Sequence, residues 1–276
     1  MKLRKSAALL LSAALSLLPT ARCAAAEAVE LPVIMYHHVL KNPKMWGDYV
    51  IPPDMLEGDL QYLRDRGYTA ISVRELIAYA EGRGELPEKP VMITFDDGQA
   101  SFAEYAIPLL EKYDMCAVAA IVGKFADIYT ENDDRNVNYA HMSWPELAEI
   151  SKNPHVELQA HTYDMHSLSS RRGCSMLSGE SPEAYRAAFS GDLERLNARF
   201  EQYLGFIPEA FAYPYGIKCS ECTRLLLDTG YKAIFSCDER VNHISSDDPA
   251  CLHDIGRFNR PYSAGRQAFF AKLGIS

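Results

Sequence analysis

The sequence lacks an excess of positive charge, internal repeats and low-complexity segments. Its formal net charge is -9, whereas a nucleic-acid-binding protein needs a basic face, so nucleic acid is excluded as a partner. Hydrophobic residues make up 48% of the 276-residue chain, which is enough for a sizeable core and excludes intrinsic disorder. No linker divides residues 27–276, and we expect them to form a single domain.

Long apolar runs are also scarce. The sequence has a single long apolar run, which lies near its N-terminus. Basic residues at positions 2, 4 and 5 precede the apolar run 7–18, which is too short to span a bilayer as a mature helix. Small residues follow at positions 24–26, and this layout is typical of a secretory signal peptide. We therefore expect residues 1–26 to be removed near Ala26, leaving a secreted or cell-surface protein without a transmembrane span.

The cysteines exclude a zinc ribbon, because the C-x-x-C pair Cys219 and Cys222 has no second pair at the required spacing. Lipidation of Cys23 is disfavoured because Arg22 occupies a position where a small residue is expected. A retained membrane anchor is the other alternative to cleavage of the N-terminal segment.

An exported chain could oxidise its thiols. This leaves open one disulfide among five cysteines, Cys174, Cys219, Cys222, Cys237 and Cys251.

Apolar runs alternate with amphipathic stretches along residues 27–276. The runs predict strands at Leu31–Met35, Thr69–Val73, Pro90–Phe95, Ala117–Val122, Val156–Ala160, Ala210–Tyr213 and Ala233–Ser236, and the amphipathic stretches predict helices at Met55–Arg66, Arg74–Glu81, Phe102–Tyr113, Trp144–Ser151, Pro182–Leu204 and Cys222–Thr229. This order predicts an α/β fold with a parallel sheet. About seven such units in about 250 residues predict a barrel, with its chemistry at the carboxyl ends of the strands.

Two of the predicted strands are followed by groups that can bind a metal. Asp96 and Asp97 leave the first of them, and because successive side chains diverge, one carboxylate can bind a metal while its neighbour faces water. His161 and His166 follow the second, five residues apart, so they would not share a helical face and can converge only in a loop. Two imidazoles and one carboxylate are a common catalytic zinc set. Taken singly, each motif is also typical of an ordinary turn or cap.

Two further motifs lie at strand ends. Pro214-Tyr215-Gly216 predicts a rigid loop, which could aim a backbone N–H at a developing oxyanion or be a plain turn. Tyr36-His37-His38-Val39 ends the first strand. The two histidines could be ligands, a proton donor or packed core side chains.

The order of these motifs, DDG then HxxxxH then PYG, each after an apolar strand, resembles the polysaccharide deacetylase family of carbohydrate esterases with a NodB-homology domain. The resemblance covers about residues 31–262. It implies a distorted (β/α)7 barrel of the NodB type that removes N-acetyl groups from an extracellular or cell-wall polysaccharide containing N-acetylglucosamine. The motif at residues 36–39 is similar to the branch with poly-N-acetylglucosamine deacetylases.

The resemblance also implies a role for each site residue. Asp97, His161 and His166 would hold Zn²⁺, or another divalent metal such as Co²⁺ or Ni²⁺. Asp96 would be the general base, and the backbone N–H of Tyr215 would stabilise the oxyanion.

His37 would be the general acid, with His38 and His253 as alternatives. The chain departs from the family at Ala212, where an arginine is usual, and at Gln99, where an aromatic residue is common. Arg257 is our candidate to orient Asp96 in place of the missing arginine.

Three other functions fit parts of the pattern. An O-acetyl esterase acting on xylan or a similar polymer would keep the fold. A non-catalytic carbohydrate-binding relative has no need for both a base and a metal triad, and the HxxxxH spacing fits a zinc amidase for peptides poorly. The expected partner is an acetylated glycan, whose linkage the sequence does not specify, and the oligomeric state is equally open.

Overall fold

The computed structural model describes residues 28–169 and 171–276. The predicted signal peptide, residues 1–26, lies outside the described residues, and so does Cys23. Within the described ranges, no helix is both long enough and apolar enough to cross a membrane. The six cysteines of these ranges are free thiols, so none of the disulfides that the sequence left open is formed here.

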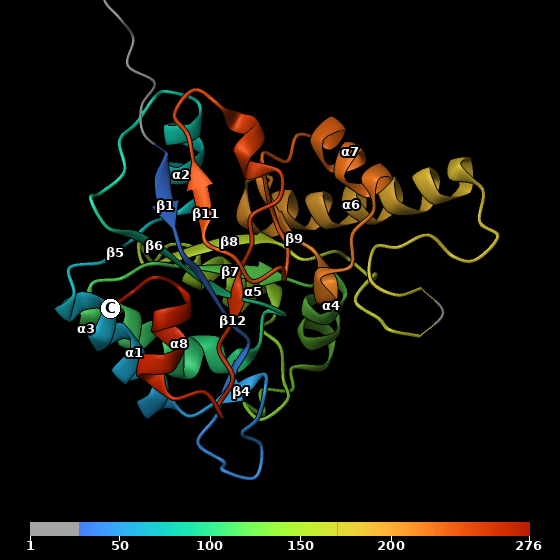
Figure 1. Ribbon diagram of the computed structural model, residues 1–276. Helices are drawn as coiled ribbons and strands as arrows, with labels where there is room; N and C mark the ends of the chain where they lie inside the picture. Colours follow the sequence, from blue (N-terminus) through green and yellow to red (C-terminus); the bar gives the residue numbers. More distant parts are fainter. Residues whose placement is uncertain (1–27, 170) are drawn as a thin grey trace, which may run out of the picture.

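A curled parallel sheet forms the centre of the fold (Figure 1). Its strands run in the order β10–β9–β8–β7–β6–β2–β12, and β5 pairs with β6. Their bounds are β2 Val33–Tyr36, β5 Thr69–Ala70, β6 Pro90–Phe95, β7 Ala117–Ile121, β8 Val156–Ala160, β9 Ala210–Ala212, β10 Ala233–Phe235 and β12 Phe258–Asn259. Ile255, just before β12, forms a parallel bridge to Phe235 of β10, so the two edges of the sheet meet. The predicted parallel barrel is therefore confirmed.

Helices and short strand pairs surround this sheet. The α-helices are α1 Pro53–Asp65, α2 Val73–Ala80, α3 Ile107–Tyr113, α4 Gly123–Asn132, α5 Trp144–Ile150, α6 Pro182–Leu204, α7 Ser220–Thr229 and α8 Arg266–Lys272. In Figure 1, α1, α3 and α8 cover one side of the sheet, and α6 and α7 lie together on the other. Strand β1 Val29–Leu31 pairs antiparallel with β11 Asn242–Ile244, and β3 His38–Val39 pairs with β4 Val50–Ile51.

The strand side chains alternate between two apolar layers. Along β6, Val91, Ile93 and Phe95 pack in the layer that contains α1, α3, α6 and α7, whereas Met92 belongs to a second cluster with the apolar side of α2. Both faces of the sheet are thus buried, as is usual for parallel strands. Thr94 is buried on the same side as Met92, so polar groups that follow this side of β6 lie inside the curl.

Several predicted bounds are confirmed, and others are wrong for local reasons. Strands β6 and β8 and helix α6 have the bounds that the sequence predicts. The predicted strand Leu31–Met35 is divided at Pro32, which has no N–H for the ladder. The predicted helix Phe102–Tyr113 begins with a π-helical turn at Phe102–Ala106. Helix α4 was not predicted, because its N-cap residue Val122 provides no capping side chain.

A buried cluster of charges joins α1 to the C-terminal segment. Asp59 of α1 is fully buried and accepts hydrogen bonds from Arg260 Nε (2.7 Å) and Arg266 Nε (2.8 Å). Tyr36 Oη of β2 donates a third bond to the same carboxylate (3.2 Å). Arg260 is itself buried, so its charge depends on Asp59 for a partner.

We expect Asp59→Asn to lower the free energy of unfolding by about 3–5 kcal/mol, because it leaves the guanidinium of Arg260 buried without a counter-charge. Glu149→Gln is the matched control, since Glu149 is 77% exposed and pairs with Lys152 at the surface, and its effect should lie within about 0.5 kcal/mol. Urea unfolding, monitored by circular dichroism, measures the change in the free energy of unfolding for both variants. Equal effects of the two substitutions would contradict the importance of the buried cluster.

Candidate active site

The polar residues that follow the parallel strands converge on one cleft of about 450 Å³. Its lining comprises Met35, His37, Tyr49, Asp96, Asp97, His161, His166, Leu168, Tyr215, Cys237 and Asn259. Six of the predicted site residues are therefore in one place, and Arg257 contacts one of them from behind. A larger cavity of about 550 Å³ lies between Tyr163–Met165 and Asp192 of α6, and none of the predicted site residues lines it.

Asp97, His161 and His166 lie close enough to hold one ion between them. Asp97 Oδ1 is 3.5 Å from His161 Nε2 and 3.0 Å from His166 Nε2. The Nδ1–H of His161 donates to the carbonyl oxygen of Ala212 (2.8 Å), which can only accept, so the lone pair of this ring is on Nε2. His166 Nδ1 is paired with Tyr215 Oη (3.2 Å). Both rings thus present Nε2 to Asp97.

The charges and the unused hydrogen-bonding capacity of this group suit a cation. Asp97 Oδ1 is buried and accepts no hydrogen bond from the described residues. Burial alone would raise the pKa of Asp97, but the neighbouring imidazoles of His161 and His166 outweigh it and hold that pKa well below its usual range. Burial would lower the pKa of His161, yet Asp96 and Asp97 together raise it. The site therefore favours positive charge, and its donor set could bind a divalent metal.

The three loops that carry these groups each contain a non-glycine residue with positive φ. These are Asp97 (φ 71°), Thr162 (φ 77°) and Tyr215 (φ 59°). Left-handed backbone is unfavourable for residues with a Cβ atom and persists only where the surroundings impose it. The sharp turn at Thr162 lets His161 and His166 face the same point, which a helix with this spacing would not allow.

Asp192 of α6 imposes the turn between the two histidines. Its carboxylate accepts hydrogen bonds from Thr162 Oγ1 (2.6 Å), Tyr163 N (2.7 Å) and Asp164 N (2.7 Å). Burial raises the pKa of Asp192 against the effect of these bonds. Sequence reasoning missed this residue. The signal that could have identified Asp192 is its position, because it is a carboxylate on the apolar side of the predicted helix Pro182–Leu204, next to Leu193.

His141, also missed, holds the turn at Asp97. Its Nδ1–H donates to the backbone carbonyl of Asp97 (2.8 Å), and its ring packs on Phe125 with centroids 4.3 Å apart. His141 forms an antiparallel bridge with Gln99, so the position where the family commonly has an aromatic residue is used in backbone pairing here.

Asp96 points inside the curled sheet and forms a bidentate ion pair with Arg257. The two bonds are Arg257 Nη1 to Asp96 Oδ1 (2.7 Å) and Nη2 to Oδ2 (2.8 Å). Both side chains are buried. Burial alone would raise the pKa of Asp96, but Arg257 together with the imidazoles of His161 and His37 lowers that pKa below its ordinary value, so the carboxylate is ionised. Arg257 thus occupies the position relative to Asp96 that its predicted orienting role requires.

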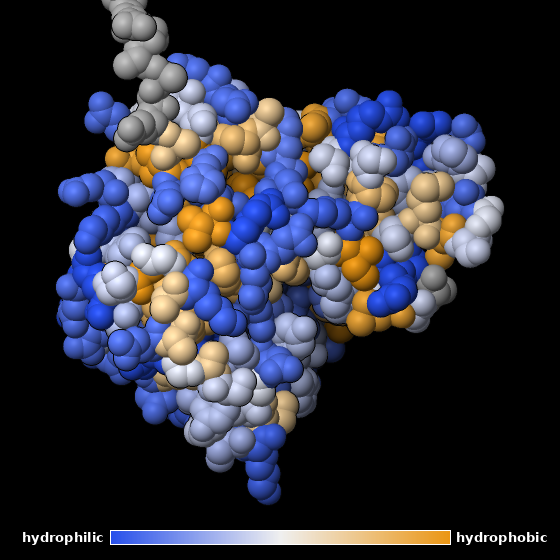
Figure 2. Space-filling model, viewed as in Figure 1, coloured by the Kyte–Doolittle hydropathy of each residue, from blue (hydrophilic) through white to orange (hydrophobic). Residues whose placement is uncertain are grey.

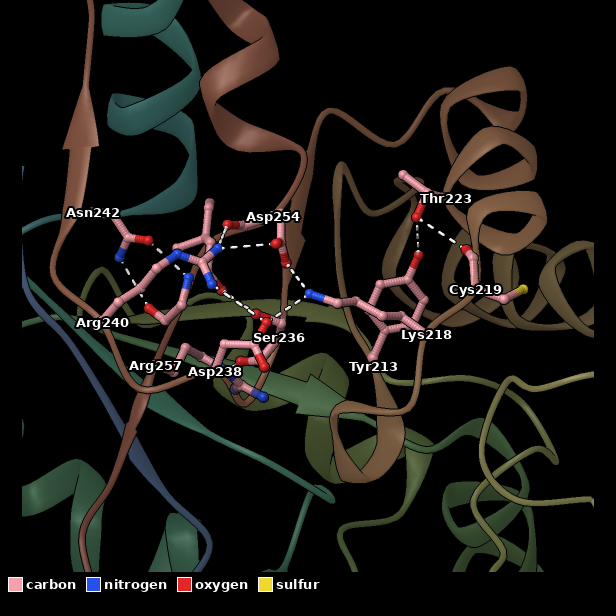
Figure 3. Close-up of polar contacts among 12 residues, drawn as sticks. Tyr213, Lys218, Cys219, Thr223, Ser236, Asp238, Arg240, Asn242, Asp254 and Arg257 are labelled. Carbon is pink, nitrogen blue, oxygen red and sulfur yellow. Dashed lines mark hydrogen bonds and ion pairs between the residues drawn. The ribbon is translucent and has the colours of Figure 1, made fainter.

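The segment after β10 holds Arg257 in turn. Arg257 Nε donates to the carbonyl of Ser236 (3.0 Å), and its backbone N–H donates to that of Asp238 (3.1 Å). Figure 3 shows how this segment is tied to its surroundings: Lys218, two residues after the PYG turn, binds Asp238 (2.7 Å) and Asp254 (2.8 Å). The ion pairs thus join the loop that carries Tyr215 to the segment that carries Arg257.

The adjacent residues His37 and His38 face different surroundings. His37 lines the cleft, and its Nδ1 has no hydrogen-bond partner among the described residues. Burial, helped by Arg257 and His161, lowers the pKa of His37, and the carboxylates of Asp96 and Asp97 oppose this shift without reversing it. His38 points away, with Nδ1 2.5 Å from Ser101 Oγ and Nε2 3.2 Å from the carbonyl of Asn138. His253 is not part of the cleft lining.

Comparisons with known proteins agree with this geometry. The sequence model of the family described as "Polysaccharide deacetylase" matches residues 83–234. A poly-beta-1,6-N-acetyl-D-glucosamine N-deacetylase of Staphylococcus aureus is 25% identical over 201 residues, covering 73% of this chain and 66% of the relative. The Escherichia coli protein of the same name is 26% identical over 212 residues, covering 70% of this chain. The match spans just under two thirds of the former relative and only 32% of the latter.

Two solved structures have the same fold as this chain. A de-N-acetylase from Aggregatibacter actinomycetemcomitans superposes with a TM-score of 0.75 at 21% identity, covering 88% of this chain and 100% of that one. IcaB from Ammonifex degensii superposes with a TM-score of 0.71 at 25% identity, covering 90% and 97%. The α/β fold expected from the sequence is therefore confirmed.

We expect Asp192→Asn to lower the free energy of unfolding by about 1–3 kcal/mol, because an amide cannot accept all three hydrogen bonds of the turn. Zn²⁺ affinity, measured by titration against a chromogenic chelator, should fall about 10–100-fold as the two histidines lose their orientation. Asp164→Asn is the control, since the exposed side chain of Asp164 pairs with Lys124 at the surface. An unchanged metal affinity in Asp192→Asn would show that the turn does not depend on this carboxylate.

Proposed function

This chain belongs to the polysaccharide deacetylase family, and we propose that it removes N-acetyl groups from a glycan containing N-acetylglucosamine. The observation that carries the proposal is the Asp97–His161–His166 group next to an ionised Asp96 in one cleft. The names of the Staphylococcus and Escherichia relatives support poly-β-1,6-N-acetylglucosamine as the substrate class. We further propose that the protein acts outside the cytoplasm, which the predicted signal peptide and this substrate class support.

Asp97, His161 and His166 are the residues that would hold a metal ion. We propose Zn²⁺, because two neutral imidazoles and a carboxylate are a common catalytic zinc set, and Co²⁺ or Ni²⁺ suits the same donors. When bound, such an ion polarises the acetyl carbonyl and lowers the pKa of a water molecule. The protein groups described next would then move the protons.

Asp96 is the proposed general base. Arg257 lowers the pKa of its carboxyl group, so Asp96 is ionised and ready to accept a proton from water. The bidentate pair also fixes the plane of the carboxylate, so that little reorientation is needed in the transition state. Arg257 thereby acts as a positioning residue.

Tyr215 and His37 complete the proposed machinery. The two hydrogen bonds of the PYG turn come from Gly216 N and Ile217 N, so neither uses the N–H of Tyr215, which can face a developing oxyanion. His37 in its protonated form would give its proton to the departing amine, which leaves poorly as an anion. Burial lowers its pKa and so makes its imidazolium a stronger acid.

The proposed activity is tested by acetate release from N-acetylated and O-acetylated oligosaccharides, with and without Zn²⁺ after chelation. We expect Asp97→Ala to lose both metal and turnover. Asp96→Asn should retain the metal and lose about 10²–10⁴-fold in turnover, because only the base is removed. Melting temperatures check that both variants are folded. Release of acetate from O-acetyl groups alone would replace the proposal with an esterase, and turnover by the chelated Asp97→Ala protein would remove the metal from the reaction.

The acid role predicts a difference between amide and ester substrates. We expect His37→Ala to lower the rate on an N-acetylated oligosaccharide by about 10²–10⁴-fold. The rate on an aryl acetate should change much less, because a phenolate departs without a proton. His38→Gln is the control and should leave both rates unchanged, since His38 faces Ser101 rather than the cleft. An equal loss on amide and ester in His37→Ala would contradict proton donation by this residue.

A further inference from the structure

Two aromatic side chains form a ledge beside the cleft, and we propose that this ledge binds a sugar ring of the glycan adjacent to the ring that is deacetylated. The aromatic ledge consists of Trp46 and Tyr262, whose ring centroids are 5.0 Å apart with an angle of 42° between the rings. Tyr262 is 44% exposed and Trp46 is partly exposed. The inference rests on the proposed function, because it extends the same substrate beyond the cleft.

The aromatic ledge is continuous with the wall of the cleft. Tyr49 and Asn259 both line the cleft, and Asn259 Nδ2 donates to the carbonyl of Asp48 (2.8 Å). Next to this contact, the backbone N–H of Tyr262 donates to the carbonyl of Gly47 (3.0 Å). The loop between β3 and β4 and the segment after β12 therefore run side by side from the cleft to the aromatic ledge.

The indole of Trp46 is held in place before any ligand arrives. Its Nε1–H donates to the carbonyl of Leu40 (2.7 Å), and Leu40 is buried, with its own N–H bonded to the carbonyl of Ile51 (2.9 Å). A fixed ring loses little conformational entropy on binding. The exposed face of the indole is thus a rigid surface rather than a mobile side chain.

The chemistry of the aromatic ledge suits a neutral sugar. Flat rings with a polar tip can pack on the C–H face of a pyranose while the sugar hydroxyls stay hydrated. In Figure 2, the lower end of the molecule, where the loop between β3 and β4 projects in Figure 1, is mostly pale, which means intermediate hydropathy, with a hydrophilic blue tip. The chain carries a net charge of -9, which disfavours an anionic membrane surface as the occupant.

Trp46 is a built-in reporter for this site. The chain has two tryptophans, and the other, Trp144, is fully buried and stacked on Tyr203. Fluorescence that acrylamide quenches therefore comes mainly from Trp46. In the full-length Asp96→Asn protein loaded with Zn²⁺, a β-1,6-linked N-acetylglucosamine pentamer should protect this fluorescence, and a dimer, which can be held within the cleft, should protect it much less.

The matching activity test compares Trp46→Ala with Phe206→Ala, an exposed aromatic residue that packs on Phe200 after α6, outside the cleft lining. Trp46→Ala should lower kcat/KM for the pentamer about tenfold, mainly through KM, and leave the rate on the dimer unchanged. Phe206→Ala should affect neither substrate.

The outcomes separate this inference from the proposed function. If the wild-type protein releases no acetate, the proposed function fails, whereas protection of Trp46 by the pentamer still reports the sugar contact. If the wild-type protein is active and Trp46→Ala keeps the full preference for the pentamer, the aromatic ledge is not a sugar subsite. Protection of Trp46 by phosphatidylglycerol vesicles, but not by the pentamer, would assign the ledge to a membrane surface and overturn the inference.

Discussion

The buried ion pair between Asp96 and Arg257 is the constraint on which the active-site cleft depends. Two charges inside a curled sheet are costly unless each neutralises the other and their remaining hydrogen-bonding groups are satisfied. The structure meets this condition, because Arg257 also donates to the carbonyl of Ser236 and to Thr94 Oγ1. The pair therefore fixes the ends of β6 and β10 relative to β12, and it sets the direction from which Asp96 faces the cleft.

Around this pair, the parallel sheet gathers loops that are far apart in the sequence. The carboxyl ends of neighbouring parallel strands meet at one edge, so the residues after β6, β8 and β9 arrive at the same cleft. Each of these three loops contains a strained residue in the left-handed conformation. The buried carboxylate of Asp192 and the imidazole of His141 hold two of those turns, which pre-organises the donors before a cation or substrate binds.

The cleft and its surroundings also differ in what they recognise. Inside, charged and imidazole groups would face the acetyl group in the proposed reaction. At the cleft wall, Tyr49 offers a flat, uncharged surface, and outside the cleft the aromatic ledge offers another, and both suit the rest of a sugar polymer. This division suits the proposed polymer substrate, in which the chemistry would occur at one acetyl group while neighbouring sugars would contribute binding energy.

The sequence by itself determined the α/β order, the Asp97–His161–His166 group and its neighbour Asp96, because short motifs at the ends of apolar strands are local in the chain. Arg257 could be named as a candidate, but its partner lies 161 residues away. Only the tertiary structure decided that His37 rather than His38 faces the cleft, that Asp192 shapes the histidine loop and that Trp46 meets Tyr262. These contacts join segments that are distant in sequence, and no local periodicity encodes which of them become neighbours when the sheet closes.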